Sequence, residues 1–350
     1  MIMSQPKRIA HADLEQFFLD ALTTAGVPPH VAAVEAQIGA EVDLHGGHTH
    51  GVALLPSVID YIRQGVLAPD PNFATIVEYP ASRLIDAGGG IGRFSSAQGM
   101  DWALERAQQY GVGSCVVRSV GHWGRGHSYA LRAARAGLVG LAFTNAFANF
   151  PAWGTRVPSL GNNPLAIGIP TADGEPVVLD LAMTQSSISR VRQAEAAGRS
   201  VPEGWGLDEC GRPTTDPSVL LQSWRFLPMG QHKGSGLAFM VDLLTAGLAG
   251  GLLAFEQGTE GRPTDSAGGS TKCFIALKPF GDWLHDRSAD LKAHIKSVEA
   301  APEQGPVQWP GEGSYQRRSD YVKNGIALEA TLADQVEELA RDLEVPIRWA

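Results

Sequence analysis

Two histidine-bearing stretches carry the side chains best suited to chemistry. His122 follows a β-branched run that ends at Val120, and it lies in a loop with several glycines. Glycines let the backbone approach a ligand closely, and an imidazole titrates near neutrality, so His122 could pass a proton to a developing alkoxide. A capping or buried histidine is the alternative, but the glycine-rich setting favours catalysis.

The second stretch, HGGHTHG, holds His45, His48 and His50 within a few residues. Neutral imidazoles at this spacing could bind a metal ion and support a metal-dependent hydrolase. No Cys, Asp or Glu stands nearby at ligand spacing, so we expect no metal. We favour one of these histidines as a proton donor, and a solvated or structural cluster remains the alternative.

Two further residues could hold an anionic or ribose-containing ligand. Asp180 closes a β-branched run and is followed by small residues, where a carboxylate could accept hydrogen bonds from ribose hydroxyls or cap a helix. Lys233 lies in MGQHKGSG, directly before an apolar helical stretch. Glycines, a helix N-terminus and a lysine together suit an anion such as pyrophosphate, although a solvated lysine is the alternative.

The segment DAGGGIG at 86–92 invites comparison with a dinucleotide fingerprint. The spacing fails, because Arg93 stands where G-x-G-x-x-G counted from Gly88 requires its last glycine. The ordinary nucleotide-binding fold is therefore not supported.

The pattern of apolar residues predicts the elements that position these groups. Helical spacing dominates residues 1–72, and β-branched runs alternate with helical stretches over 73–285, which predicts an α/β fold with a mixed sheet. An amphipathic helix at 332–343 could pack back on the N-terminal helices. We expect residues from about 286 to 350 to complete the helical subdomain.

Composition excludes several classes of protein. With 44% apolar residues among 350 and a net charge of −9, the chain can bury a large core and is unsuited to nucleic acid or an anionic membrane. Three widely spaced cysteines and a start without an apolar run favour a cytoplasmic protein with reduced thiols. The apolar stretch 234–255 contains Asp242 and many glycines, which favours a buried helix over a membrane span.

Taken together, these stretches resemble the malate/L-lactate dehydrogenase family of NAD(P)-dependent oxidoreductases, which lack the usual dinucleotide fold. The resemblance extends along nearly the whole chain, and its shared motifs are most similar to the 2,3-diketo-L-gulonate reductase branch. The motifs are THG at 49–51, GHWGRGHSY at 121–129, TN at 144–145, PAWG at 151–154, GNNP at 161–164, LDLA at 179–182, PMGQHKGSGL at 228–237 and PGE at 310–312.

The resemblance implies a non-Rossmann, three-layer α/β fold and a homodimer whose active site lies between subunits. It implies NAD or NADP as the cofactor, with NADH preferred, and a histidine at His50 or His122 as the proton donor. The cofactor-binding positions that it implies are Asn163, Asp180, Leu181, Ala182, His232, Lys233, Gly311, Glu312 and Gly313.

We therefore expect an NAD(P)H-dependent reductase of a small 2-oxo acid, such as a sugar-derived keto acid. His122 would act as acid/base, with His50 polarising the carbonyl or donating the proton itself. The expected substrate contacts are Thr49, Arg125, Asn145 and Trp153. Malate or lactate, ureidoglycolate and cyclic imino acids are alternative substrates, and a non-catalytic binding protein is an alternative class.

Five positions depart from the family pattern. Thr49 replaces a serine and keeps its hydroxyl, whereas Leu54 replaces an arginine that could bind a carboxylate bidentately. Ala146 stands where relatives often have serine, and Ser189-Arg190 where many have Gly-Lys. These departures bear on the substrate more than on the fold.

Overall fold

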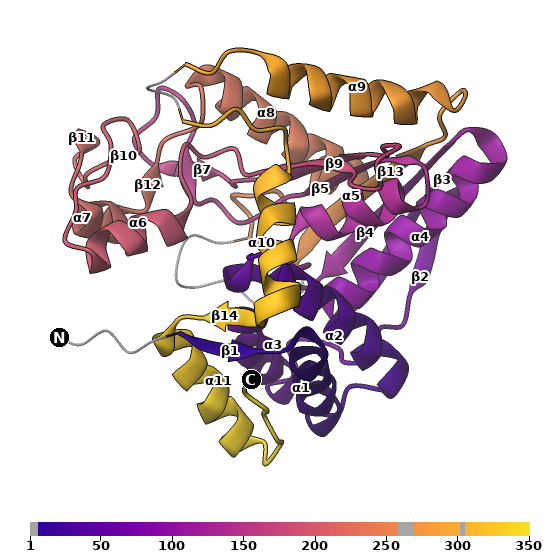
Figure 1. Cartoon of the computed structure of the whole chain (residues 1–350), viewed down its shortest axis with the longest axis horizontal. Coiled ribbons are helices and arrows are strands. Elements are labelled where there is room, and N and C mark those ends of the chain that lie inside the picture. The colour runs from indigo at the N-terminus through magenta and orange to yellow at the C-terminus, as the bar shows by residue number, and fades with distance from the viewer. Residues whose placement is uncertain (1–5, 258–268, 302–304) are drawn as a thin grey trace.

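A seven-stranded mixed sheet forms the centre of the molecule (Figure 1). It is seen in a computed structural model that describes residues 6–257, 269–301 and 305–350. The strands, in their order across the sheet, are β2 (Ala74–Tyr79), β3 (Ser82–Gly90), β4 (Val112–Val120), β13 (Ser270–Leu277), β5 (Val139–Thr144), β8 (Leu165–Ile169) and β9 (Val177–Leu181).

The strand directions bring the chemically interesting loops to one edge of this sheet. β3 and β4 are parallel, β13 runs antiparallel to both β4 and β5, and β8 runs antiparallel to both β5 and β9. β3, β4, β5 and β9 therefore all end at the same edge, and β13 and β8 begin there. The loops that carry His122, Asn145 and Ala182 leave the sheet at this edge.

Helices cover both faces of the sheet, which gives the expected three layers. α4 (Gly92–Tyr110) and α5 (Gly126–Arg135) pack on one face, where Trp123, Tyr129 and Phe274 form part of a buried cluster. α8 (His232–Asp242) packs on the other face through Ala238 and Val241. The six β-branched runs expected from sequence are present as β2, β3, β4, β5, β8 and β9.

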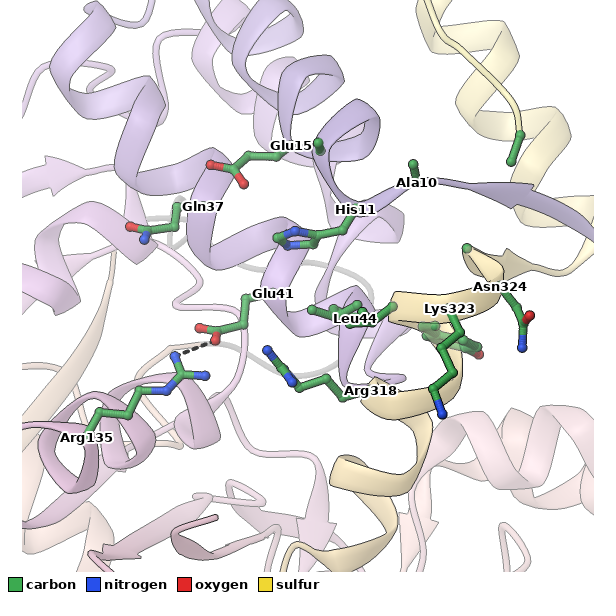
Figure 2. Close-up of a pocket in the computed structure, with 15 residues that line it drawn as sticks. Ala10, His11, Glu15, Gln37, Glu41, Leu44, Arg135, Arg318, Lys323 and Asn324 are labelled. Carbon is green, nitrogen blue, oxygen red and sulfur yellow. Dashed lines mark hydrogen bonds and ion pairs between the residues drawn. The ribbon is translucent and has the colours of Figure 1, made fainter. Parts of the chain in front are cut away.

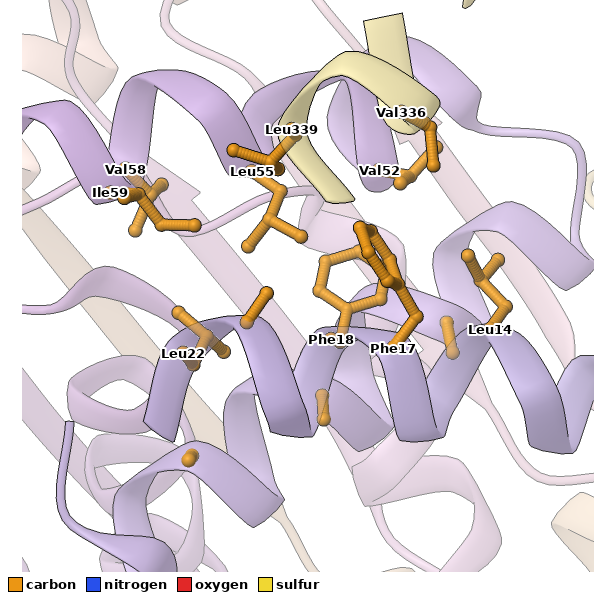
Figure 3. Close-up of a cluster of buried hydrophobic side chains, with 14 of the residues drawn as sticks. Leu14, Phe17, Phe18, Leu22, Val52, Leu55, Val58, Ile59, Val336 and Leu339 are labelled. Carbon is orange, nitrogen blue, oxygen red and sulfur yellow. The ribbon is translucent and has the colours of Figure 1, made fainter. Parts of the chain in front are cut away.

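A second core joins the two ends of the chain (Figure 3). Phe17, Phe18 and Leu22 of α1 (His11–Thr24) face Leu55 and Ile59 of α3 (Leu55–Arg63) within one buried cluster. α11 (Ala330–Asp342) adds Val336 and Leu339, and β1 (Lys7–Ile9) pairs with β14 (Ile326–Leu328). The C-terminal helix thus packs on the N-terminal helices, as the sequence predicts.

Further helices, short strands and turns complete the fold. α9 (Trp283–Ser297) contacts the α/β part through Lys292, whose Nζ lies 2.7 Å from Asp173 Oδ2. The remaining elements are α2 (Pro29–Leu44), the 3₁₀ turns η1 (His48–His50) and η2 (Val52–Leu54), β6 (Phe150–Pro151), β7 (Pro158–Leu160), α6 (Ile188–Ala196), β10 (Gly206–Leu207), β11 (Pro213–Thr214), α7 (Pro217–Ser223), β12 (Arg225–Phe226) and α10 (Glu312–Asn324).

The apolar stretch 234–255 differs from the single buried helix that its composition predicts. α8 ends at Asp242, and a π-helical segment, η3 (Leu243–Gly247), follows it. Its small residues face the sheet, whereas its large apolar side chains are exposed: Leu237, Phe239, Met240, Leu243, Leu244, Leu248, Leu252 and Phe255. Across the described ranges, no helix has both the length and the hydropathy needed to cross a bilayer.

Candidate active site

The two histidine stretches meet at the shared edge of the sheet. The ring centroids of His50 and His122 lie 5.9 Å apart, with the ring planes inclined by 39°. His50 comes from η1, and His122 comes from the loop after β4. Both residues remain exposed, so a small molecule could contact both imidazoles at once.

The hydrogen bonds of the two imidazoles differ. The backbone N–H of Gly124 donates to Nδ1 of His122 over 3.0 Å, so this nitrogen is an acceptor and the neutral ring carries its proton on Nε2. Nδ1 of His50 lies 2.9 Å from the Thr49 hydroxyl, which can either donate or accept. His50 can therefore keep its hydrogen bond in both protonation states, and His122 cannot.

Although both side chains reach the surface, the protein packed around the two imidazoles desolvates them and lowers the pKa of both histidines. For His122 the nearby positive charges of His50, Lys272 and Arg93 lower the pKa further, to well below its ordinary value. For His50 the carboxylate of Asp180 opposes this fall in pKa, while Arg125 and Arg93 add to it. Asp180 therefore stabilises the protonated form of His50, whereas no carboxylate has a comparable effect on His122.

Arg125 and Asp180, expected to contact substrate and cofactor respectively, form one ion pair. Nε of Arg125 lies 2.6 Å from Oδ2 of Asp180. Gly126 opens α5 beside them, and a Cβ at this glycine would come within 3.3 Å of Asp180 Oδ1. Only Nε of Arg125 is used in this pair, so its two terminal nitrogens can still bind an anion.

Arg93, which the sequence presents only as a misfit to the dinucleotide fingerprint, supports the His50 loop. Its Nη2 donates to the carbonyl oxygens of His50 and Gly51 over 3.0 and 3.2 Å. The side chain is 1% exposed and pairs with the equally buried Glu35 of α2, which also accepts from the N–H of Phe94. A charged residue at a core-facing spacing in α2 is the sequence signal that could have identified this pair.

Asp43, near the end of α2, holds the same loop from its other side. Its Oδ1 lies 2.8 Å from Nδ1 of His48, and its Oδ2 accepts from the N–H of Val52 over 2.7 Å. A Cβ at Gly51 would come within 2.2 Å of this carboxylate, so glycine is required there. Glu35 and Asp43 together make α2 the element that fixes the position of His50.

Two of the expected cofactor residues, His232 and Lys233, lie at the N-terminus of α8. The N–H of Met229 donates to the carbonyl of Met183 over 2.9 Å, which brings the segment after β9, with Ala182, beside His232 and Lys233. Both of these side chains are exposed. A helix N-terminus flanked by a lysine and a histidine is suited to a phosphate group.

A second glycine turn lies against β9 itself. Gly311, at φ +98°, is so close to Val178 that a Cβ there would lie 3.0 Å from its carbonyl oxygen. Glu312 is buried, and its carboxylate binds Nζ of Lys296 at 2.6 Å. Glu312 therefore holds the turn in place, with its carboxylate also accepting from the backbone N–H of Trp309, and the glycine on either side of Glu312 is only half-buried.

Two asparagines expected to touch ligands are buried and fully engaged. Asn145 donates to Asp242 and to the carbonyl of Leu252, and accepts from the N–H of Thr271. Asn163 accepts from Ala146 and donates to the carbonyl of Ala238. Both hold strand ends and α8 together from below the surface. Trp153, by contrast, is 46% exposed, and its backbone N–H donates to the hydroxyl of Ser235 in α8.

The three clustered histidines diverge and do not form a metal site. His45 is buried against His127, with ring centroids 4.8 Å apart, while His48 binds Asp43 and His50 binds Thr49. No group of three or more potential metal-ligating side chains occurs in the parts of the chain that the structure describes. The geometry therefore gives no support to a metal-dependent hydrolase.

A cavity of about 690 Å³ lies between α1, α2 and α10 (Figure 2). Its wall mixes both signs of charge, with Glu15 and Glu41 opposite Arg318 and Lys323, and Arg135 pairs with Glu41 at 2.5 Å. None of the expected site residues lines it. The exposed histidine edge, rather than this cavity, carries the groups suited to acid–base chemistry.

The fold and the site define a class of enzyme. Within the described residues, the seven-stranded sheet has a single parallel strand pair, and the neighbouring imidazoles of His50 and His122 lie at the edge where this pair ends. This arrangement is that of a dehydrogenase built outside the ordinary dinucleotide fold. The chain belongs to the malate/L-lactate dehydrogenase family, whose model matches residues 9–337.

Known proteins agree with this family over nearly the whole chain. A 2,3-diketo-L-gulonate reductase of Citrobacter koseri is 31% identical and covers 95% of this chain and 100% of its own. The solved malate dehydrogenase of Entamoeba histolytica superposes with a TM-score of 0.91 at 28% identity, covering 98% and 99% of the two chains. The Δ1-piperideine-2-carboxylate reductase of Pseudomonas syringae gives 0.85 at 29% identity, covering 95% and 100%.

These relatives make the protein an oxidoreductase of small keto or hydroxy acids, as the sequence predicts. A dehydrogenase of this family uses a nicotinamide cofactor.

Proposed function

We propose that the protein is an NAD(P)H-dependent reductase of a small 2-oxo acid in which His50 donates the proton to the carbonyl oxygen. The observation that carries this assignment is the hydrogen bonding of the two imidazoles. A cationic His50 can donate from Nδ1 to the Thr49 hydroxyl while Nε2 donates to substrate. Asp180 favours the cation that this role requires.

His122 suits a different role. Protonation of its Nδ1 would break the hydrogen bond from Gly124, and the loss of Nε2–H from a neutral ring would leave an imidazolate. We therefore assign His122 as a neutral hydrogen-bond donor that polarises the substrate carbonyl through Nε2. This reverses the order of roles that the sequence favours.

The site also fits the cofactor. Lys233 and His232 at the N-terminus of α8 would bind the pyrophosphate, and the turn at Gly311–Gly313 would line the cofactor beside Asp180. When bound, the nicotinamide supplies the hydride. NADH is our preferred cofactor over NADPH.

Arg125 is the proposed partner of the substrate carboxylate. Its terminal nitrogens are free of the pair with Asp180, and Leu54, half-buried in η2, offers no charge of its own. The named activities of the relatives suggest 2,3-diketo-L-gulonate, malate or lactate, and cyclic imino acids as candidate substrates.

We further propose a cytoplasmic homodimer that buries the apolar face of α8 and η3. Leu237, Phe239 and Leu244 lie within a run of exposed large apolar side chains, and a contiguous apolar surface of this kind marks an interaction site. Trp153 and the N-terminus of α8 adjoin this face, so a second copy would lie next to the cofactor residues. The three cysteines are free thiols, which fits the cytoplasm.

The test is a screen of NADH and NADPH oxidation with pyruvate, oxaloacetate, 2,3-diketo-L-gulonate and cyclic imino acids. With the best substrate, His50→Gln should lower kcat about 10²–10⁴-fold, because acid catalysis is lost. His122→Gln keeps a donor N–H and should cost only about tenfold. His294→Gln, on exposed α9, serves as the control. Equal, large losses in both site variants would contradict the division of roles.

A further inference from the structure

Lys272 is a buried lysine near the candidate active site that the roles described so far do not use. It lies on β13, opposite Val117 of β4 and Thr144 of β5, and it is 1% exposed. The strand register shifts between Ser270 and Lys272, at the sheet edge where β4 and β5 end. Burying a charged lysine in the central strand of a sheet costs free energy unless its ammonium group makes compensating interactions.

No described carboxylate forms an ion pair with Lys272. Its Nζ donates instead to the hydroxyl of Ser270, which donates to the carbonyl of Val120 over 2.9 Å. Through Ser270 the ammonium group is therefore linked to Val120, two residues before His122. Burial alone lowers the pKa of Lys272 to about 7, so the side chain changes charge near neutrality.

Besides burial, which is the largest cause, three positively charged groups lower the pKa of His122. They are His50 from η1, Arg93 from α4 and Lys272 from β13, and each disfavours a second proton on the imidazole. His50 is the proposed proton donor, and Arg93 binds Glu35 and the carbonyl oxygen of His50. Lys272 is therefore the one of these three charged groups to which no other role has been assigned.

We propose that Lys272 is a positioning residue that acts through His122: its buried ammonium, held by Ser270 beside Val120, helps to keep His122 in the neutral form that hydrogen-bonds the substrate carbonyl. The proposal rests on the role assigned to His122 above. It also explains how two adjacent histidines can differ in charge, because Lys272 acts on His122, whereas Asp180 acts on His50.

The direction of the effect follows from the charge states. Lys272 is protonated below about pH 7, which is the range in which His122 would otherwise gain a second proton. Within that range His50 can be cationic while His122 stays neutral. Loss of the lysine charge should therefore raise the pKa of His122 and leave His50 unaffected.

The direct test is a histidine NMR titration of Lys272→Met and Lys272→Gln in the full-length protein without ligands. At about pH 5 the imidazolium population of His122 should rise at least threefold in both variants, which is a shift of about half a pH unit. Lys278→Met, an exposed lysine just after the same strand, is the matched control and should leave His122 unchanged. This readout requires no turnover, so it stands even if the proposed reaction fails.

The pH profile of kcat/KM is the second readout. The acid limb should move upward by the same amount in both Lys272 variants, while the alkaline limb, set by His50, stays in place. Two results would overturn the proposal: an unchanged His122 titration in folded variants, or an effect seen with Met but not with Gln, which would indicate packing rather than charge. If Lys272→Met fails to fold, Lys272→Gln alone decides, because it can keep the bond to Ser270.

Discussion

At the scale of single residues, hydrogen-bond partners separate imidazoles that look equivalent in the sequence. His45, His50 and His122 all lie in glycine-rich stretches, yet one is buried against His127, one binds a hydroxyl and one accepts from a backbone N–H. Each partner favours a different protonation state or tautomer of the imidazole. The spacing of the motifs located these histidines, but the hydrogen bonds that distinguish them depend on the three-dimensional structure.

His45 makes stability depend on pH. Desolvation, assisted by nearby arginines, lowers its pKa from 6.5 to about 3. The unfolded state therefore binds more protons below about pH 6.5, so this contribution to stability is complete above that pH and is lost progressively as the pH falls toward 3. Between pH 7 and 5 the loss from His45 should be about 2 kcal/mol.

Denaturant titrations at the two pH values check this directly. His45→Gln should lose about 2 kcal/mol less than the parent protein on acidification, whatever its stability at pH 7. His294→Gln, at an exposed position, should lose as much as the parent. Identical acid losses in the parent protein and His45→Gln would show that His45 is not the titrating group.

At the scale of elements, α2 is a rigid support with two charged attachment points. Its apolar spacing correctly predicted a helix, but two of its acidic residues, Glu35 and Asp43, face inward and hold Arg93, His48 and Val52. A buried pair such as Glu35–Arg93 is a weak source of stability, yet it is costly to break from one side. The pair instead helps to position His50, because Arg93 donates hydrogen bonds to the carbonyl oxygens of His50 and Gly51.

Variants of this pair should separate stability from activity. Glu35→Ala leaves Arg93 buried and unpaired, and should cost about 3–5 kcal/mol of unfolding free energy. The double variant Glu35→Leu/Arg93→Met should recover at least half of that loss. Its kcat/KM should still fall more than about tenfold, because the His50 loop loses its anchor. Full activity in a stable double variant would remove Arg93 from the site.

The strand that sequence reasoning missed is the one in the middle of the sheet. β13 reads STKCFIAL, and a buried lysine, Lys272, lies near its start, where a strand in the middle of a sheet is expected to be apolar. The rule that buried strands are apolar failed at the position where Lys272 lies. Composition also overestimated the burial of residues 234–255, because a local apolar pattern does not distinguish a side chain that faces the core from one that is exposed.

At the scale of the whole molecule, the order of the motifs predicted the family and the fold class, whereas the preference for NADH over NADPH and the homodimer are proposals. The exposed apolar face of α8 and η3 gives the dimer its test. Leu248 is 65% exposed on that face, so Leu248→Glu should convert a dimer into monomers of 37.2 kDa in light-scattering chromatography. Turnover should fall with the dimer fraction, because the site adjoins this face.

The control for that experiment is Val322→Glu, which adds the same charge at a similarly exposed position on α10. It should leave both the mass and the turnover unchanged. A dimer that survives Leu248→Glu would place the subunit contact on another surface, and a monomeric parent protein would exclude the homodimer altogether.

The pairing of β1 with β14 has a consequence for the order of synthesis. Lys7 aligns with Leu328, and the core around Phe17 and Phe18 includes Val336 and Leu339. The N-terminal helices are translated first, so the part of their apolar surface that α11 covers stays exposed until α11 has left the ribosome. During that interval we expect the nascent chain to be more prone to aggregation than the folded protein, in which α11 closes the helical core.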